Sequence, residues 1–130
     1  MFSLDTNICI ALLKGEPAAV DRLRGCSPAT VVVCAVVRAE LQYGARKSAQ
    51  VERNLGRLDR FLAPLHNLPF DERAAAEFGL IRVSLERAGQ PIGAYDLLIA
   101  AIARAHDLTV VTRNHGEFAR VPGLRVEVWD

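Results

Sequence analysis

The segment Phe2-Ser3-Leu4-Asp5-Thr6-Asn7 gives the strongest indication of the architecture. A short apolar run, long enough for one strand, ends in an acid, a hydroxyl and an amide, and a helical pattern over 7–14 follows at once. Open α/β sheets place their ligand sites where a buried strand ends beside a helix N-terminus. We therefore expect other polar side chains to converge on the edge of the sheet that carries Asp5.

The rest of the chain alternates between β-branched runs and helical patterns. Strands are predicted at 30–34, 109–111 and 124–128, with a further short strand at 65–68. Helices are predicted from Pro17, over 35–45, from a cap at Ser48, from Asp71 and over 93–106. The segment 97–103 is apolar on all sides, so this last helix should be central. The alternation favours an α/β fold with a mainly parallel sheet of four to five strands and helices on both faces, in one domain over 1–130.

Composition excludes several classes of protein. At 130 residues and 51% hydrophobic content, the chain can bury a real core and is not disordered. It has no apolar run of membrane-spanning length and no secretory leader pattern, so no membrane association and a cytoplasmic, bacterial location are expected. Cys9, Cys26 and Cys34 follow no zinc or redox spacing, and Cys9 and Cys34 lie in apolar runs where burial is expected.

Charge gives a mixed indication. The formal net charge of +1 predicts no bulk attraction to nucleic acid, but 14 of the 16 basic residues are Arg, which is suited to forked phosphate contacts. Arg53, Arg57 and Arg60 form a stripe on the helix after Ser48, away from its apolar residues. With Arg46, this stripe can contact an RNA backbone. The alternative for the stripe is a solvated helix face without a binding role. The alternative for the high Arg content is a GC-rich genome.

Two acids have competing interpretations. Asp5 is either a helix N-cap or a metal ligand. Glu40 falls on a helical wheel within the apolar arc of Val37 and Leu41, an arc that Tyr43 extends. A bare buried carboxylate is too costly, so Glu40 is metal-bound, paired with an Arg, or placed at the rim of the core.

The later polar positions have the same ambiguity. Asp96 lies near the start of the most apolar helix. There it is a helix cap, a charge placed favourably in the helix dipole, or a metal ligand. Thr112, Arg113 and Asn114 end a strand, and Glu117 follows three residues after Asn114. These two form a capping box or contact a metal. Carboxylates that cluster repel one another unless a cation neutralises them, and Mg²⁺ or Mn²⁺ prefers such oxygen ligands. Without a Cys/His set, zinc is disfavoured.

These segments together resemble the PIN-domain ribonucleases, and within them the VapC toxins of bacterial toxin–antitoxin pairs. The matching segments are Leu4-Asp5-Thr6-Asn7, Arg38-Ala39-Glu40-Leu41-Gln42-Tyr43-Gly44, Tyr95-Asp96-Leu97-Leu98-Ile99-Ala100, Val111-Thr112-Arg113-Asn114 with Glu117-Phe118, and Pro122-Gly123-Leu124. They occur in the expected order and span the whole chain. The resemblance implies a three-layer α/β/α fold and an endoribonuclease that needs Mg²⁺ or Mn²⁺.

By position, the resemblance makes Asp5, Glu40 and Asp96 the metal ligands. Together with Asn114, these residues would act in catalysis. Many relatives have Asp at the position of Asn114, and others have Asp at the position of Glu117. The resemblance further implies a homodimer and a VapB-like antitoxin that covers the pocket in a hetero-oligomer. Thr6 and Thr112 would orient the ligands.

The substrate would be RNA, with transfer or ribosomal RNA as candidates. Two alternatives remain open: a non-catalytic RNA- or protein-binding regulatory module of the same fold, and a DNA-directed nuclease. A haloacid-dehalogenase-type phosphatase fits poorly, because its second Asp would stand where this chain has Asn7.

Overall fold

A parallel β-sheet forms the centre of the computed structural model, which describes residues 1–113 and 115–129. The sheet has the order β2-β1-β3-β4, and all three strand pairs are parallel. The strands are β1 (Phe2–Leu4), β2 (Val31–Val32), β3 (Thr109–Thr112) and β4 (Arg125–Val128). The predicted parallel sheet of four to five strands is therefore confirmed. Asn114 lies outside the described residues.

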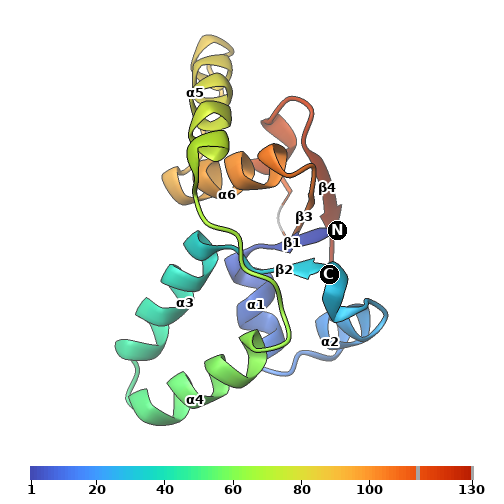
Figure 1. Ribbon diagram of the computed structural model, residues 1–130, viewed down its shortest axis with the longest axis vertical. Helices are drawn as coiled ribbons and strands as arrows, with labels where there is room; N and C mark the ends of the chain where they lie inside the picture. Colours follow the sequence, from blue (N-terminus) through green and yellow to red (C-terminus); the bar gives the residue numbers. More distant parts are fainter. Residues whose placement is uncertain (114, 130) are drawn as a thin grey trace.

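Helices cover both faces of this sheet, as the α/β prediction requires. They are α1 (Thr6–Leu13), α2 (Pro17–Arg24), α3 (Ala35–Arg46), α4 (Val51–Leu62), α5 (Glu72–Arg87) and α6 (Ala94–Ala105), with 3₁₀ turns at Pro28–Thr30 and Phe118–Arg120. In Figure 1, α5 and α6 lie on one side of the strands and α1 and α2 on the other, while α3 and α4 extend away from the sheet edge. The three-layer α/β/α arrangement follows.

The core is built around β1 and α6. Ser3 and Leu4 have no exposed surface, and α6 buries seven of its residues: Leu97, Ile99, Ala100, Ala101, Ile102, Ala103 and Ala105. The predicted central position of this helix is confirmed. A strand covered on both faces needs the near-continuous apolar run that the sequence provides.

The strand predicted at 30–34 is shorter in the structure. Thr30 ends a 3₁₀ turn, β2 consists of Val31–Val32, and Cys34 is the N-cap of α3. The strand predicted at 65–68 is reduced to a single parallel bridge between Val32 and His66. There, the Arg38 side chain binds the segment: its Nε donates to the carbonyl of Val33 at 2.7 Å, and its Nη2 donates to the carbonyls of Leu65 and His66 at 3.2 Å each.

The prediction that Ser48 caps the next helix is wrong. Gln50 occupies the N-cap of α4 and makes no side-chain capping bond. The Ser48 hydroxyl instead donates to the carbonyl of Ala45 at 2.6 Å and accepts from Asn54 Nδ2 at 2.9 Å. Its hydrogen bonds therefore stabilise the corner between α3 and α4.

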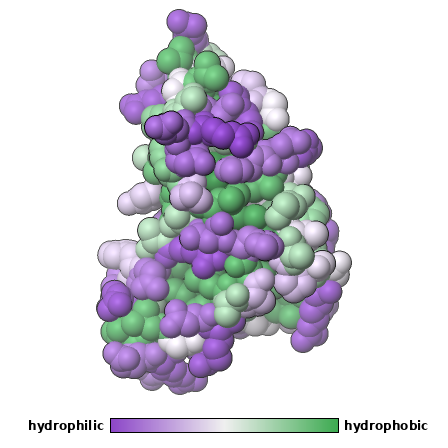
Figure 2. All heavy atoms as spheres, viewed as in Figure 1, coloured by the Kyte–Doolittle hydropathy of each residue, from purple (hydrophilic) through white to green (hydrophobic). Residues whose placement is uncertain are grey.

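Surface hydrophobicity is patchy. Figure 2 shows hydrophobic areas separated by bands of hydrophilic side chains on the face seen in Figure 1. Tyr43, predicted to extend the core-facing arc of α3, is 66% exposed, because this edge of the helix has no described neighbour to cover it. Leu80 and Val83 are also exposed, on the outer side of α5. Within the described residues, no helix is long and apolar enough to cross a membrane.

Candidate functional site

Asp5 both caps α1 and faces the polar edge of the sheet. It is 5% exposed, and its Oδ1 accepts a hydrogen bond from the backbone N–H of Ile8 at 2.9 Å. Burial raises the pKa of this carboxyl, a hydrogen bond with the Thr112 side chain lowers it, and the nearby charge of Glu40 raises it. The capping interpretation is therefore right, and it does not exclude a role in binding, because one carboxylate oxygen is enough to cap the helix.

Glu40 lies at the rim of the core, on the same helix as the buried residues Val37 and Leu41. Its Oε1 accepts a hydrogen bond from the Thr6 hydroxyl at 2.7 Å, which connects α3 to the first turn of α1. Among the described residues, no Lys or Arg lies within ion-pair distance of this carboxylate. The Glu40 charge is therefore oriented by a neutral donor and remains uncompensated.

Asp96 and Glu117 form a carboxyl pair. Glu117 Oε1 accepts a hydrogen bond from the backbone N–H of Gly93 at 3.1 Å, directly before α6. Burial raises the pKa of Asp96 to about 7, and a hydrogen bond with Glu117, together with the charges of Glu117, Asp5 and Glu40, adds to this effect. The same hydrogen bond lowers the pKa of Glu117.

The proton of this pair belongs on Asp96, which is the more buried partner. The Glu117 side chain also contacts the start of α6 through Gly93. The capping box predicted for Asn114 and Glu117 involves Asn114, which lies outside the described residues.

One cavity brings three of the predicted acids together. Its volume is about 590 Å³, and it is lined by Asp5, Thr6, Asn7, Ile10, Ala39, Glu40, Tyr43, Gly44, Lys47, Tyr95 and Asp96. We call this the acid cavity. Asp5 comes from the end of β1, Glu40 from α3 and Asp96 from α6, so segments far apart in the sequence meet at the edge where β1 and β3 end.

The donor set suits a hard divalent cation, because the residues that line the acid cavity offer carboxylate oxygens and include no cysteine or histidine. No three His, Cys, Asp or Glu side chains in the described part of the chain are already placed to ligate one ion. Each of the three carboxyls has another partner: Asp5 caps α1, Glu40 accepts a hydrogen bond from Thr6, and the raised pKa of Asp96 favours one proton on the Asp96–Glu117 pair. A cation would replace that proton as the compensating charge.

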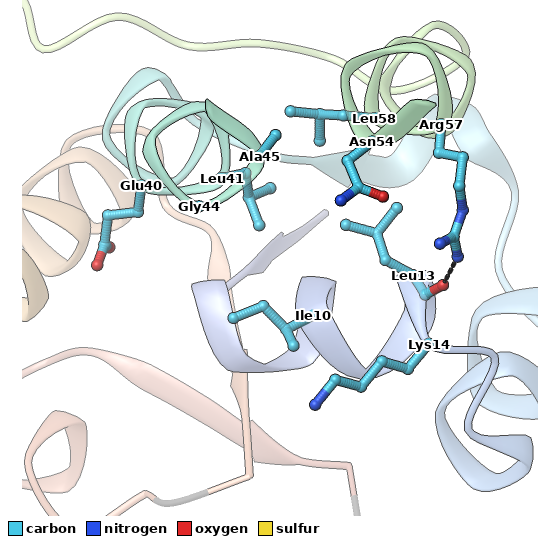
Figure 3. A pocket seen from close by; sticks show the side chains of 10 residues that line it. All are labelled: Ile10, Leu13, Lys14, Glu40, Leu41, Gly44, Ala45, Asn54, Arg57 and Leu58. Carbon is cyan, nitrogen blue, oxygen red and sulfur yellow. Dashed lines mark hydrogen bonds between the residues drawn. The ribbon is translucent and has the colours of Figure 1, made fainter. Parts of the chain in front are cut away.

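A second cavity lies beside the first and is largely apolar. It has a volume of about 310 Å³ and shares Ile10, Glu40 and Gly44 with the acid cavity. Figure 3 shows side chains of α1 facing those of α3 and α4 across it, with Glu40 at one side. Its other lining residues are Leu13, Lys14, Leu41, Ala45, Asn54, Arg57 and Leu58. We call this the apolar cavity.

The arginines proposed for RNA contact lie outside the acid cavity. Arg57 lines the apolar cavity, where its guanidinium donates to the backbone carbonyl of Leu13 (Figure 3). Arg53 donates to Gln50 Oε1 at 3.1 Å, and Arg46 and Arg60 are exposed. Lys47 is the basic side chain that does line the acid cavity.

Sequence reasoning did not assign Asn7, Tyr43 or Tyr95 to the site, although all three line the acid cavity. Each stands within three residues of a predicted acid, and this proximity is the signal that could have identified them.

Comparison with known families agrees with this geometry. The family described as "PIN domain" matches residues 3–124. The chain belongs to the PIN-domain family. The PIN domain is 43% identical over 128 residues to a tRNA(fMet)-specific endonuclease VapC of Shigella flexneri, covering 98% of this chain and 97% of the relative. It is 39% identical over 134 residues to Ribonuclease VapC2 of Rickettsia felis, covering 100% and 98%.

Related chains with a similar fold have been solved within complexes. A chain of VapBC2 from Rickettsia felis, bound to a DNA fragment from their promoter, matches with a TM-score of 0.94 at 39% identity, covering 99% of this chain and 98% of that chain. A chain of DNA-bound VapBC from Salmonella typhimurium matches with a TM-score of 0.93 at 41% identity, with the same coverage. The fold and the recognition as a VapC-type PIN domain are therefore confirmed.

Proposed function

We propose that this PIN domain is a divalent-metal-dependent endoribonuclease that hydrolyses phosphodiester bonds as the toxin of a toxin–antitoxin pair. The observation that carries the proposal is the meeting of Asp5, Glu40 and Asp96 in one cavity, where none of them forms an ion pair with a Lys or Arg of the described residues. The three carboxylates repel one another, and a bound cation would neutralise that repulsion. The names of the relatives support RNA as the substrate.

Asp5, Glu40 and Asp96 would hold the ion, Mg²⁺ or Mn²⁺. When bound, the ion supplies charge for a scissile phosphate oxygen and lowers the pKa of an attacking water. The protein orients the ligands: Thr6 holds Glu40, and Thr112 holds Asp5.

Glu117 interacts with Asp96, the third proposed metal ligand. Because its ionised carboxylate accepts a hydrogen bond from protonated Asp96, it would hold the Asp96 side chain in place until a cation displaces that proton to solvent. Asn114 is proposed as a further catalytic position on sequence grounds alone.

The proposed substrate is a transfer RNA, with initiator tRNA as the first candidate, because two VapC relatives at 43% and 41% identity are named for that specificity. Arg46, Arg53, Arg57 and Arg60 would contribute phosphate contacts beyond the acid cavity. With a net charge of +1, recognition depends on local shape and contacts rather than on bulk attraction.

The proposed protein partner is a VapB-like antitoxin, supported by solved VapBC complexes of relatives. The apolar cavity beside the acid cavity would accept an apolar antitoxin segment, and its position would let that segment reach Glu40. A homodimer is also proposed, with Leu80 and Val83 of α5 offering exposed apolar surface for it.

The decisive experiment is cleavage of a mixed pool of transfer and ribosomal RNA by antitoxin-free protein with Mg²⁺, Mn²⁺ or EDTA. Asp96→Asn is compared with Asp59→Asn, a matched control at an exposed aspartate on α4 away from both cavities. We expect discrete products that require metal, disappear with Asp96→Asn and persist with Asp59→Asn. Equal cleavage by both variants, or none by folded wild type, would contradict the proposal, and a DNA pool would then test the alternative nuclease.

A further inference from the structure

The chain has two tyrosines, and both line the acid cavity. Tyr43 is 66% exposed and Tyr95 is 60% exposed, which places them among the most exposed large hydrophobic side chains in the described structure. Neither hydroxyl has a hydrogen-bond partner among the residues that the structure describes. The rings therefore do not contribute to the core, and their polar ends are not held by the fold.

Each ring is carried next to a proposed metal ligand. Tyr43 follows Glu40 by three residues on α3, and Tyr95 directly precedes Asp96 in the first turn of α6. Two different helices thus each bring one carboxylate and one aromatic ring to the same cavity. This arrangement places flat apolar surface beside the point where a phosphate would be cut.

A cation accompanies one of the rings. Lys47 Nζ lies 5.2 Å from the centroid of the Tyr43 ring, and Lys47 also lines the acid cavity. An exposed cation–π contact is too weak to explain why a large ring is kept in water. The combination of ring and ammonium instead suits a nucleotide, since a base stacks on the ring while its phosphate meets the charge.

We propose that Tyr43 and Tyr95 are specificity-determining residues, each of which stacks on an unpaired base on one side of the scissile phosphate. The inference rests on the proposed nuclease function and deepens it. Bases within a duplex have both faces covered by their neighbours and cannot stack on a side chain, whereas bases of loops and single strands can. Lys47 would contact the backbone next to the base on Tyr43.

The test separates binding from cleavage. Affinity for a short single-stranded RNA carrying one 2-aminopurine is measured by fluorescence in the Asp96→Asn background, which prevents turnover, with Mg²⁺ present. Tyr43→Ala and Tyr95→Ala should each weaken binding roughly 5- to 150-fold and reduce quenching of the fluorescent base, because a stacked base contributes about that factor. Tyr43→Phe and Tyr95→Phe keep the ring and should bind like the parent.

Two controls keep the test specific. Phe70→Ala removes a partly exposed aromatic ring away from the acid cavity and should leave binding unchanged. The same RNA annealed to its complement should bind equally to the parent and to the alanine variants. Circular dichroism verifies that each variant is folded.

Cleavage then assigns the positions. With active protein, removing the base on one side of the cut should lower kcat/KM for wild type and have no further effect on the variant that lacks the corresponding ring. Unchanged RNA affinity in both alanine variants would overturn the stacking proposal even if the protein is a nuclease. Ring-dependent binding without any cleavage would uphold the stacking proposal and contradict the nuclease.

Discussion

The raised pKa of Asp96 leads to a prediction about stability that is independent of any substrate. In the metal-free protein its pKa is raised from 3.8 to about 7, mainly by burial and by the neighbouring Glu117. Between these two pH values the folded state holds a proton that the unfolded chain releases. The free energy of unfolding must therefore fall as the pH rises through this window.

The magnitude follows from the size of the shift. A change of roughly three pKa units corresponds to ~4 kcal/mol, but Asp96 is only half-buried and solvent screens part of that cost. At pH 8 we expect the free energy of unfolding of Asp96→Asn, which is neutral at every pH, to exceed that of wild type by ~1–2 kcal/mol. Below about pH 3 the wild-type carboxyl is largely protonated in both states, so the difference should vanish.

Urea denaturation with EDTA at several pH values measures this difference, with Asp59→Asn as the control whose stability relative to wild type stays constant. Adding Mg²⁺ at pH 8 should stabilise wild type far more than Asp96→Asn, because the variant has lost a ligand charge. A variant that is less stable than wild type at pH 8, or a difference that does not change with pH, would refute the reasoning.

Two further predictions concern the scaffold. Arg38→Leu should lower the free energy of unfolding by ~2 kcal/mol or more in urea denaturation, because three backbone carbonyls lose their charged donor. The control Arg53→Leu, on an exposed helix face, should change the free energy of unfolding by less than ~0.5 kcal/mol. Equal losses in the two variants would contradict this account. Burial raises the pKa of Cys9 and Cys34, so a thiol reagent at pH 8 should label only Cys26 in the native protein and all three after denaturation; native labelling of two or more thiols would show that the core opens.

The sequence predicted those parts of the site that depend on local pattern. Asp5 ends an apolar run and Glu40 interrupts an apolar arc, so each could be singled out from its neighbours alone. The parallel topology then required the ends of β1 and β3 to share one edge. The helix α6 runs back along the sheet before β3 begins, so its first turn places Asp96 at the same edge as Asp5.

What failed to follow from the sequence depends on distant neighbours. A helical wheel placed Tyr43 beside Val37 but could not show that nothing packs over that edge of α3. Ser48 has the chemistry of a helix cap, yet its hydroxyl bonds at the preceding corner, where Ala45 and Asn54 are within reach. These contacts depend on how α3 meets α4, which no local pattern specifies.

The order of the strands has a consequence for the ribosome that makes this protein. The central strand β1 is synthesised first, but its partner β3 begins 107 positions later in register, since Phe2 pairs with Thr109. Contacts so far apart in sequence form late in folding. A nascent chain can bring Asp5 and Glu40 together early, because β1 pairs with β2 and Thr6 binds Glu40, but the acid cavity lacks its third acid until α6 supplies Asp96 and β3 pairs with β1. On the proposed function, a chain that is still being translated would therefore not have its complete set of acids until the residues through β3 have left the ribosome.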